Sequence, residues 1–136
     1  MSERINISSG AQWEAIVGYS RAVRLGNVVE VAGTTAVDEQ GNVVGINQPG
    51  EQTRYILHKI ATALQAAGAT LEDVVRTRIF VTDISRWEEV GRAHGEFFRT
   101  VKPVATMVEV KALISPELMV EIEVSALLQE QKGTSE

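Results

Sequence analysis

The 136-residue sequence contains no cysteine, three prolines and only 5% aromatic residues. Without cysteine the chain has no disulfide framework, no thiolate metal site and no cysteine nucleophile. No stretch approaches the roughly 18–20 consecutive apolar residues of a membrane span, and the first ten residues lack the basic-then-apolar profile of a secretory signal. We therefore expect a cytoplasmic protein with no membrane partner.

Positive charge is also scarce, because 13 Lys and Arg residues face 18 Asp and Glu residues, for a net charge of −5. This balance argues against nucleic acid as a partner, since phosphate binding depends on clustered basic side chains. The phosphate-cradling patterns GxxxxGK[ST] and GxGxxG are absent, and the two histidines are remote and lie in no metal-binding motif. We expect neither a cofactor nor a metal site.

The remaining composition, 44% hydrophobic and 23% charged, is typical of one soluble globular domain. Apolar residues switch between period two and period 3.6, which predicts an α+β fold over residues 1–128. The polar tail of residues 129–136 has nothing to bury, and we expect it to be disordered. The predicted strands cover residues 21–25, 28–33, 75–83, 105–111 and 118–128, and the predicted helices cover residues 51–67 and the segment from Ser85 to just before Pro103.

Local signals support these boundaries. Gly26-Asn27 is suited to a hairpin turn, and Gly68 stands where a helix would end in a left-handed residue. Thr70 with Asp73 resembles a capping arrangement for a single turn, and Ser85 followed by Glu88 is typical of a capping box for the second helix. The apolar face of that helix should comprise Trp87, Val90, His94, Phe97 and Phe98.

Two helices can cover only one face of the sheet. Strand residues such as Val29, Val31, Ala105, Met107 and Val108 nevertheless appear apolar on both sides of the pleat. A half-covered apolar sheet is most simply buried against copies of itself. We therefore predict a homo-oligomer with pockets between its subunits.

Few residues suggest chemistry by themselves. We expect His58 on the polar side of the first helix and His94 packed beside Val90 and Phe98. Glu121 and Glu123 share one face of the last strand. They form either a solvated or ion-paired surface, or a general base that orients water.

Several stretches occur together in a particular order: GYSRAV at 18–23, LGNVVEVAGTTA at 25–36, AAGATLEDVVRTRIFVTDI at 66–84, and PVATMVEV and LMVEIEVSA near the end. In this order they resemble the Rid family, also called YjgF or reactive-intermediate deaminase, over residues 13–128. The resemblance implies a chorismate-mutase-like mixed sheet with two helices on one face. It also implies a barrel-like homotrimer with a cleft between each pair of neighbouring subunits.

In the best-known branch of that family, enamine and imine intermediates made by pyridoxal-phosphate enzymes are hydrolysed to a 2-keto acid and ammonia without a cofactor. The resemblance makes Glu121 the catalytic residue that positions water. Ala105 stands where the family arginine grips the substrate carboxylate, and Gly91 stands where an asparagine lines the cleft. The expected ligand-binding positions are Tyr19, Ala32, Gly33, Gly91, His94, Ala105, Thr106 and Met107.

Alanine offers neither charge nor donor to a carboxylate, and losing such a contact costs about 2–5 kcal/mol. One prediction is thus a small-metabolite-binding protein that hydrolyses imines, enamines or related C–N bonds with an altered substrate range. A second is a 2-iminobutanoate or 2-iminopropanoate deaminase in which Arg21 or Arg78 anchors the carboxylate. A third is a non-catalytic ligand-sensing or protein-interaction module. Cleavage of single-stranded RNA, an activity attached to some relatives, has little support from this charge and aromatic content.

Overall fold

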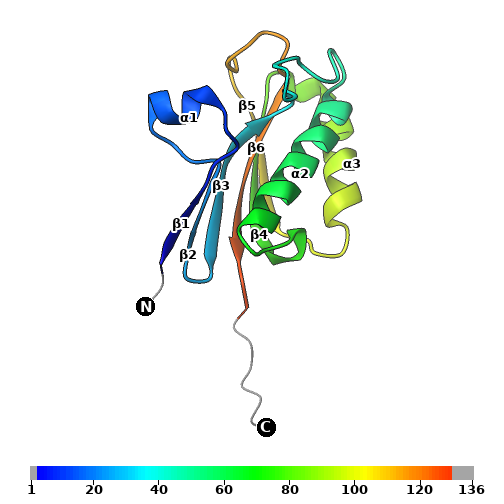
Figure 1. Cartoon of the computed structure of the whole chain (residues 1–136). Coiled ribbons are helices and arrows are strands. Elements are labelled where there is room, and N and C mark those ends of the chain that lie inside the picture. The colour runs from blue at the N-terminus through cyan, green and yellow to red at the C-terminus, as the bar shows by residue number, and fades with distance from the viewer. Residues whose placement is uncertain (1–2, 130–136) are drawn as a thin grey trace.

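The computed structural model describes residues 3–129, which form a six-stranded mixed sheet with two long helices on one face (Figure 1). The strand order is β1-β2-β3-β6-β4-β5, in which only β4 and β5 pair in parallel. The strands are β1 (Arg4–Ile7), β2 (Ala22–Leu25), β3 (Val28–Thr35), β4 (Val74–Val81), β5 (Val104–Glu109) and β6 (Val120–Leu127), and the α-helices are α1 (Gln12–Val17), α2 (Pro49–Ala66) and α3 (Trp87–Phe98). The expected α+β fold is confirmed.

The covered face holds the core. Helix α2 buries the residues that the helical spacing predicted, including Ile56, Ile60 and Leu64, against alternate residues of β3, β4 and β6. Helix α3 buries Val90 and Phe98 as expected. Trp87 does not join that face, because it occupies the first turn of α3 and its side chain is 56% exposed.

Most turn and cap predictions are confirmed. Gly26 (φ 63°) and Gly68 (φ 84°) both take left-handed conformations, and Thr70 forms a reciprocal capping box with Asp73. The capping box at Ser85 is wrong. Ser85 instead donates through its backbone N–H and its hydroxyl to Asp83, at 3.1 Å and 2.6 Å. This aspartate therefore opens a 3-10 turn at Ile84–Arg86, from which α3 continues without a side-chain cap.

Two elements near the N-terminus, β1 and α1, were not predicted. Strand β1 pairs with β2 at the edge of the sheet, and α1 is a six-residue helix that ends at Gly18 (φ 90°). Its buried residue is Glu14, whose carboxylate accepts hydrogen bonds from the side chains of Ser8 and Ser9 and from the backbone N–H of Ser9. Trp13, Ile16 and Val17 recur at helical spacing in α1, but the run is short and the three side chains are exposed.

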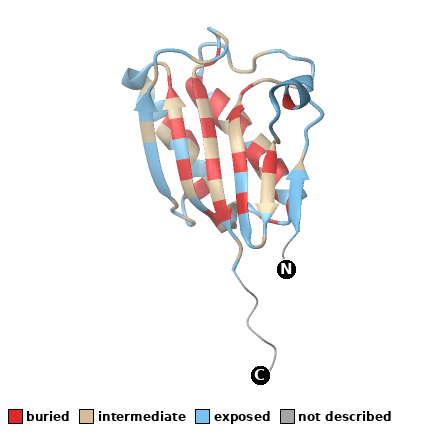
Figure 2. Ribbon diagram, turned by 90° about the vertical axis from the view of Figure 1, so that its left-hand side faces the viewer, coloured by how far each residue is buried: buried red, intermediate tan, exposed pale blue. Residues whose placement is uncertain are grey.

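The opposite face of the sheet carries no long helix, and only α1 lies at one corner of it (Figure 2). We call this the open face. Val29 and Val31 both point to the covered face, so the prediction that they mark both faces is wrong for this strand. Apolar side chains are still exposed on the open face, together with arginines and glutamates; they include Val28, Val104 and Val108.

The predicted tail lies outside the described residues except for Gln129. None of the helices within residues 3–129 is long and apolar enough to cross a bilayer.

Candidate functional site

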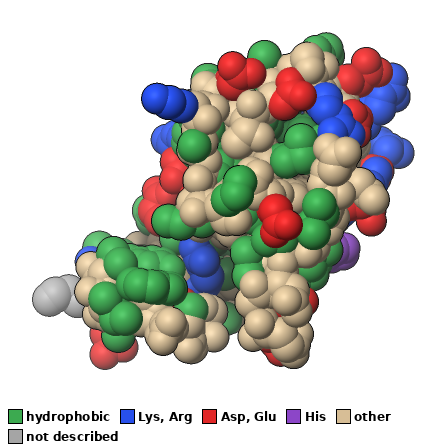
Figure 3. Space-filling model, turned by 90° about the horizontal axis from the view of Figure 1, so that it is seen from above, with side chains coloured by type: hydrophobic (Ala, Val, Ile, Leu, Met, Phe, Trp, Pro, Cys, Tyr) green, Lys and Arg blue, Asp and Glu red, His purple; other side chains and the backbone are tan. Residues whose placement is uncertain are grey.

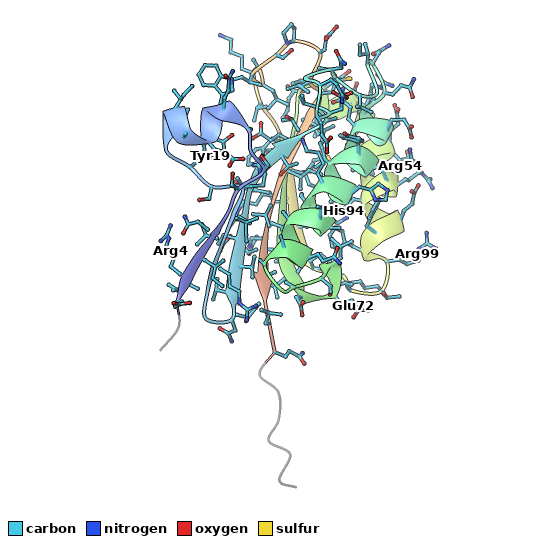
Figure 4. All side chains as sticks on the ribbon, in the orientation of Figure 1. Arg4, Tyr19, Arg54, Glu72, His94 and Arg99 are labelled. Atoms are coloured by element: carbon cyan, nitrogen blue, oxygen red, sulfur yellow. The ribbon has the colours of Figure 1, made fainter. Side chains whose placement is uncertain are left out.

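The site residues expected from the sequence lie in two groups on opposite faces of the sheet. Glu121 lies on the open face, because it alternates with the buried Val120 and Ile122 of β6. In Figure 4, Tyr19 lies near α1 on that side, whereas His94 lies among the helices on the other side. One chain therefore does not bring all the predicted residues into one pocket.

The first group surrounds an irregularity in β3. The pairing of β3 with β6 shifts register between Val31 and Thr34, so Ala32 and Gly33 form a bulge beside Glu121. A Cβ built at Gly33 would overlap the Oε2 atom of Glu121. Glycine at this position therefore lets the carboxylate lie directly against the β3 backbone. Gly33 and Glu121 are therefore direct neighbours.

Glu121 is half-buried, and no hydrogen bond or ion pair joins its carboxylate to any described side chain or backbone group. Its cross-strand neighbours, Thr35 of β3 and Phe80 of β4, bring no charge. Burial raises the pKa of Glu121, the nearby Arg21 opposes this, and Glu123 adds to it, so that the net shift is upward. This carboxyl group can take up a proton more readily than an exposed glutamate.

Glu123, two residues along the same strand, has a different environment. Its carboxylate lies 3.7 Å from the guanidinium of Arg78 on β4, and both side chains are more than a third exposed. This is the ion-paired surface that the sequence left as one of two alternatives. Of the two acids on this face, Glu121 is therefore the candidate general base.

Arg21, one of the two arginines considered as a substitute anchor, belongs to the first group. Its Nη2 atom donates to the carbonyl oxygen of Gly33 at 2.6 Å, and its Cζ atom lies 5.9 Å from the centroid of the Tyr19 ring. Arg78 is instead held by Glu123. Arg21 thus links Tyr19, Gly33 and the surroundings of Glu121.

A groove of about 430 Å³ runs along the open face next to this group. The residues that line it include Tyr19, Ala32, Arg78 and Glu123. Seen from above, apolar side chains gather on the lobe formed by α1, and a hollow separates this lobe from the rest of the molecule (Figure 3). The groove has room for a small molecule or for a side chain of another protein.

The second group lies on the covered face near edge strand β5. The Nε2 atom of His94 is 3.0 Å from the Oγ1 atom of the buried Thr77, and the imidazole packs on Phe98 with ring centroids 4.7 Å apart. Burial lowers the pKa of His94, so the ring is neutral at pH 7. The prediction that His94 packs beside Phe98 is confirmed. Its possible role in a pocket stays a prediction.

Strand β5 completes the second group. Ala105 pairs with Thr77 and Met107 with Ile79, so both face the same side as His94. Thr106 alternates to the open face, where it pairs with Arg78. Gly91 lies one turn before His94 on α3, next to Trp87. Within residues 3–129 no group of three His, Asp or Glu side chains could hold a metal ion.

Comparison with known proteins gives consistent results. A family model described as Endoribonuclease L-PSP matches residues 9–128. The structure of Rv2704 from Mycobacterium tuberculosis, a member of the YjgF/YER057c/UK114 family, is 53% identical and covers 93% of this chain and 100% of that one, with a TM-score of 0.84. An uncharacterized protein of Streptomyces coelicolor is 38% identical over 121 residues, which is 88% of this chain and 89% of that protein. The YjgF gene product of Escherichia coli is 26% identical and covers 91% of this chain and 94% of that one, with a TM-score of 0.77.

Proposed function

This chain belongs to the Endoribonuclease L-PSP family, also called the YjgF or Rid family, and we propose that it hydrolyses C=N bonds of small metabolites. The reaction takes place in clefts formed between copies of the chain, and Glu121 transfers the proton. The observation that carries this proposal is the half-buried carboxylate of Glu121, which has no partner among the described residues. A carboxylate without a structural partner is costly to bury, so a chemical role is the better explanation.

The two groups of site residues support a cleft shared between copies. Ala105 and Met107 lie on β5, the edge strand of the sheet, which has a neighbouring strand on one side only. Ala105 is exposed. The open face of another copy carries Glu121 and Gly33 and has exposed apolar side chains that need a cover. A head-to-tail contact between β5 of one copy and the open face of the next closes into a ring when the rotation between neighbouring copies is a whole fraction of a turn. The resemblance to the Rid family implies such a ring, a homotrimer.

The chemistry needs one water molecule and no cofactor. The ionised Glu121 accepts a proton from water as the water oxygen adds to the carbon of the protonated C=N bond and the π electrons move to nitrogen, which gives a neutral carbinolamine. The protonated carboxyl then gives its proton to nitrogen, and the C–N bond breaks as the hydroxyl oxygen forms the C=O bond and loses its proton to the carboxylate. Glu121 passes that proton to the departing ammonia, so a carbonyl compound and an ammonium ion leave and the carboxylate is ionised again. A carboxyl group with a raised pKa suits both halves of this exchange at neutral pH.

The substrate differs from that of the branch with an arginine in β5. Ala105 gives no positive charge to hold a carboxylate, which favours a neutral substrate or one that is anchored elsewhere. A 2-imino-acid deaminase is the second candidate, and it is favoured by the presence of Arg21 in the Glu121 group. A binding module without turnover is the third.

The first test measures keto-acid release from freshly generated 2-iminopropanoate and 2-iminobutanoate, and benzaldehyde release from N-benzylidenemethylamine, an acyclic imine without a carboxylate. Glu121→Gln should lower the rate of any accelerated reaction by about 100-fold, because it removes the proton acceptor and keeps the shape. Glu123→Gln is the matched control and should retain activity. Full activity of Glu121→Gln would refute the catalytic role, and a wild type inert on all three imines would leave the binding module.

A second experiment tests whether the cleft is shared. One variant, Glu121→Gln, disables the open-face group. A second variant, Met107→Trp, places a large side chain in the β5 group and blocks that half of the cleft. If each cleft takes one group from each of two copies, co-refolding the two inactive variants restores about a quarter of the wild-type activity, since random assembly joins two intact groups at that frequency. If one chain supplies the whole site, the mixture stays inactive.

A further inference from the structure

We propose that Arg21 is a positioning residue for Glu121. Arg21 holds the β3 bulge against the carboxylate of Glu121 and provides the positive charge near that carboxylate. This inference rests on the proposed role of Glu121. It assigns a role in this reaction to a residue that lies outside the PVATMVEV segment, where the family arginine would stand.

The backbone fixes Arg21 between two strands. Its N–H donates to the carbonyl of Ile7 at 2.8 Å, and its own carbonyl accepts from the N–H of Ala32 at 3.0 Å. From this position the side chain reaches the carbonyl of Gly33 at 2.6 Å, which is a short, charge-assisted hydrogen bond. Since Gly33 lies against the carboxylate of Glu121, Arg21 sets the backbone on which that carboxylate rests.

A purely structural role does not explain this side chain well. The Nε atom of Arg21 is buried and has no hydrogen-bond partner among the described residues. Leaving a buried donor unpaired costs stability, so a residue that served packing alone would carry fewer donors. Arg24 of β2 contrasts with it, because Nε and Nη1 of Arg24 both donate to backbone carbonyls.

The charges that face Glu121 are few. On β6 its same-face neighbour is Glu123, which is negative, and its cross-strand neighbours Thr35 and Phe80 are uncharged. Lys59 of α2 donates to the carbonyls of Thr35 and Val37 and does not contact the carboxylate. Arg21 is the positive group that lowers the pKa of Glu121, and it does so without an ion pair that would block the carboxylate from a substrate. Neutralising Arg21 should therefore leave Glu121 harder to ionise.

The test is a titration of the Glu121 carboxyl carbon by NMR in the full-length protein, compared between wild type, Arg21→Gln and Arg21→Lys. The midpoint should move to higher pH in Arg21→Gln and stay near the wild-type value in Arg21→Lys, which keeps the charge. Arg78→Gln is the matched control, because it removes an arginine from the same face that is paired with Glu123. Arg21→Met provides a second neutral variant with a long apolar stem if the glutamine variant does not fold.

The titration needs no turnover, so its outcome is independent of whether the protein hydrolyses imines. If hydrolysis is found, the acidic limb of the pH–rate profile should follow the same order, with rescue in Arg21→Lys. An unchanged midpoint in both neutral variants would overturn the inference even if Glu121 is catalytic. Equal shifts in Arg21→Gln and Arg78→Gln would overturn it too, because they would show a general loss of positive charge.

Discussion

Replacing Gly33 with alanine should remove the function of the open-face group while leaving the fold intact. The new Cβ would occupy the position of Oε2 of Glu121, so one of the two must move. The backbone of Gly33 is not left-handed, and alanine can adopt it without strain. The carboxylate is the end of a flexible side chain, and turning it away from its preferred rotamer costs about 0.5–1.5 kcal/mol.

The effect on activity should be much larger than the effect on stability. Moving a catalytic group by about 1 Å costs about 100-fold in rate, which corresponds to about 2.7 kcal/mol in the barrier. The melting temperature should fall by only a few degrees, or about 2–8 °C for each kcal/mol lost. The assay compares imine hydrolysis and thermal unfolding of wild type, Gly33→Ala and Glu121→Gln. A Gly33→Ala protein with wild-type turnover would refute the argument that the carboxylate must rest against Gly33.

Three further predictions concern other parts of the structure. Gly95→Ala on α3 places a methyl group in open space and should raise the free energy of unfolding by about 0.5–1 kcal/mol in chemical denaturation, whereas a loss would mean that the space is filled. Because burial lowers the pKa of His94 below its ordinary 6.5, the unfolded chain protonates first, and stability should fall as the pH drops through 6.5 toward the folded value. His94→Gln should remove this dependence, and the exposed His58, changed to Gln, should keep it. Glu14→Gln should destabilise the protein by about 1–2 kcal/mol, since it weakens the hydrogen bonds from the Ser9 side chain and backbone, and an unchanged urea midpoint would show that α1 does not depend on them.

Periodicity predicted the elements whose burial is regular. Helix α2 and strand β6 alternate buried and exposed residues over long runs, and both were found within two residues of their true ends. Helix α1 was missed because it has only six residues, although Trp13, Ile16 and Val17 recur at helical spacing. In the structure these three residues are 58%, 66% and 68% exposed, and the buried residue of the helix is an acid. Its existence depends on hydrogen bonds from a serine pair rather than on an apolar face. A run of six residues contains too few turns for periodicity alone to identify such a helix.

The site was predictable in part for a similar reason. Alternation along β6 placed Glu121 and Glu123 on one face, and the structure agrees. What alternation could not distinguish is that Glu123 has an arginine opposite while Glu121 has a phenylalanine and a threonine. That difference depends on the register of two neighbouring strands and on a bulge in one of them, and register is decided by packing across the sheet.

The predicted site residues lie on two faces of the sheet, and this separation determines which properties of the site can change independently. His94, Ala105 and Met107 lie beside one sheet edge, and Glu121 with Gly33 lies on the face that no long helix covers. A substitution in β5 therefore changes one wall of a shared cleft and leaves the hydrogen bond between Arg21 and Gly33 untouched. Loss of a carboxylate anchor at Ala105 need not disturb the proton-transfer group, because the two belong to different copies in the proposed assembly. Substrate range and proton transfer can then vary independently, and the mixed assembly of Glu121→Gln with Met107→Trp measures that independence directly.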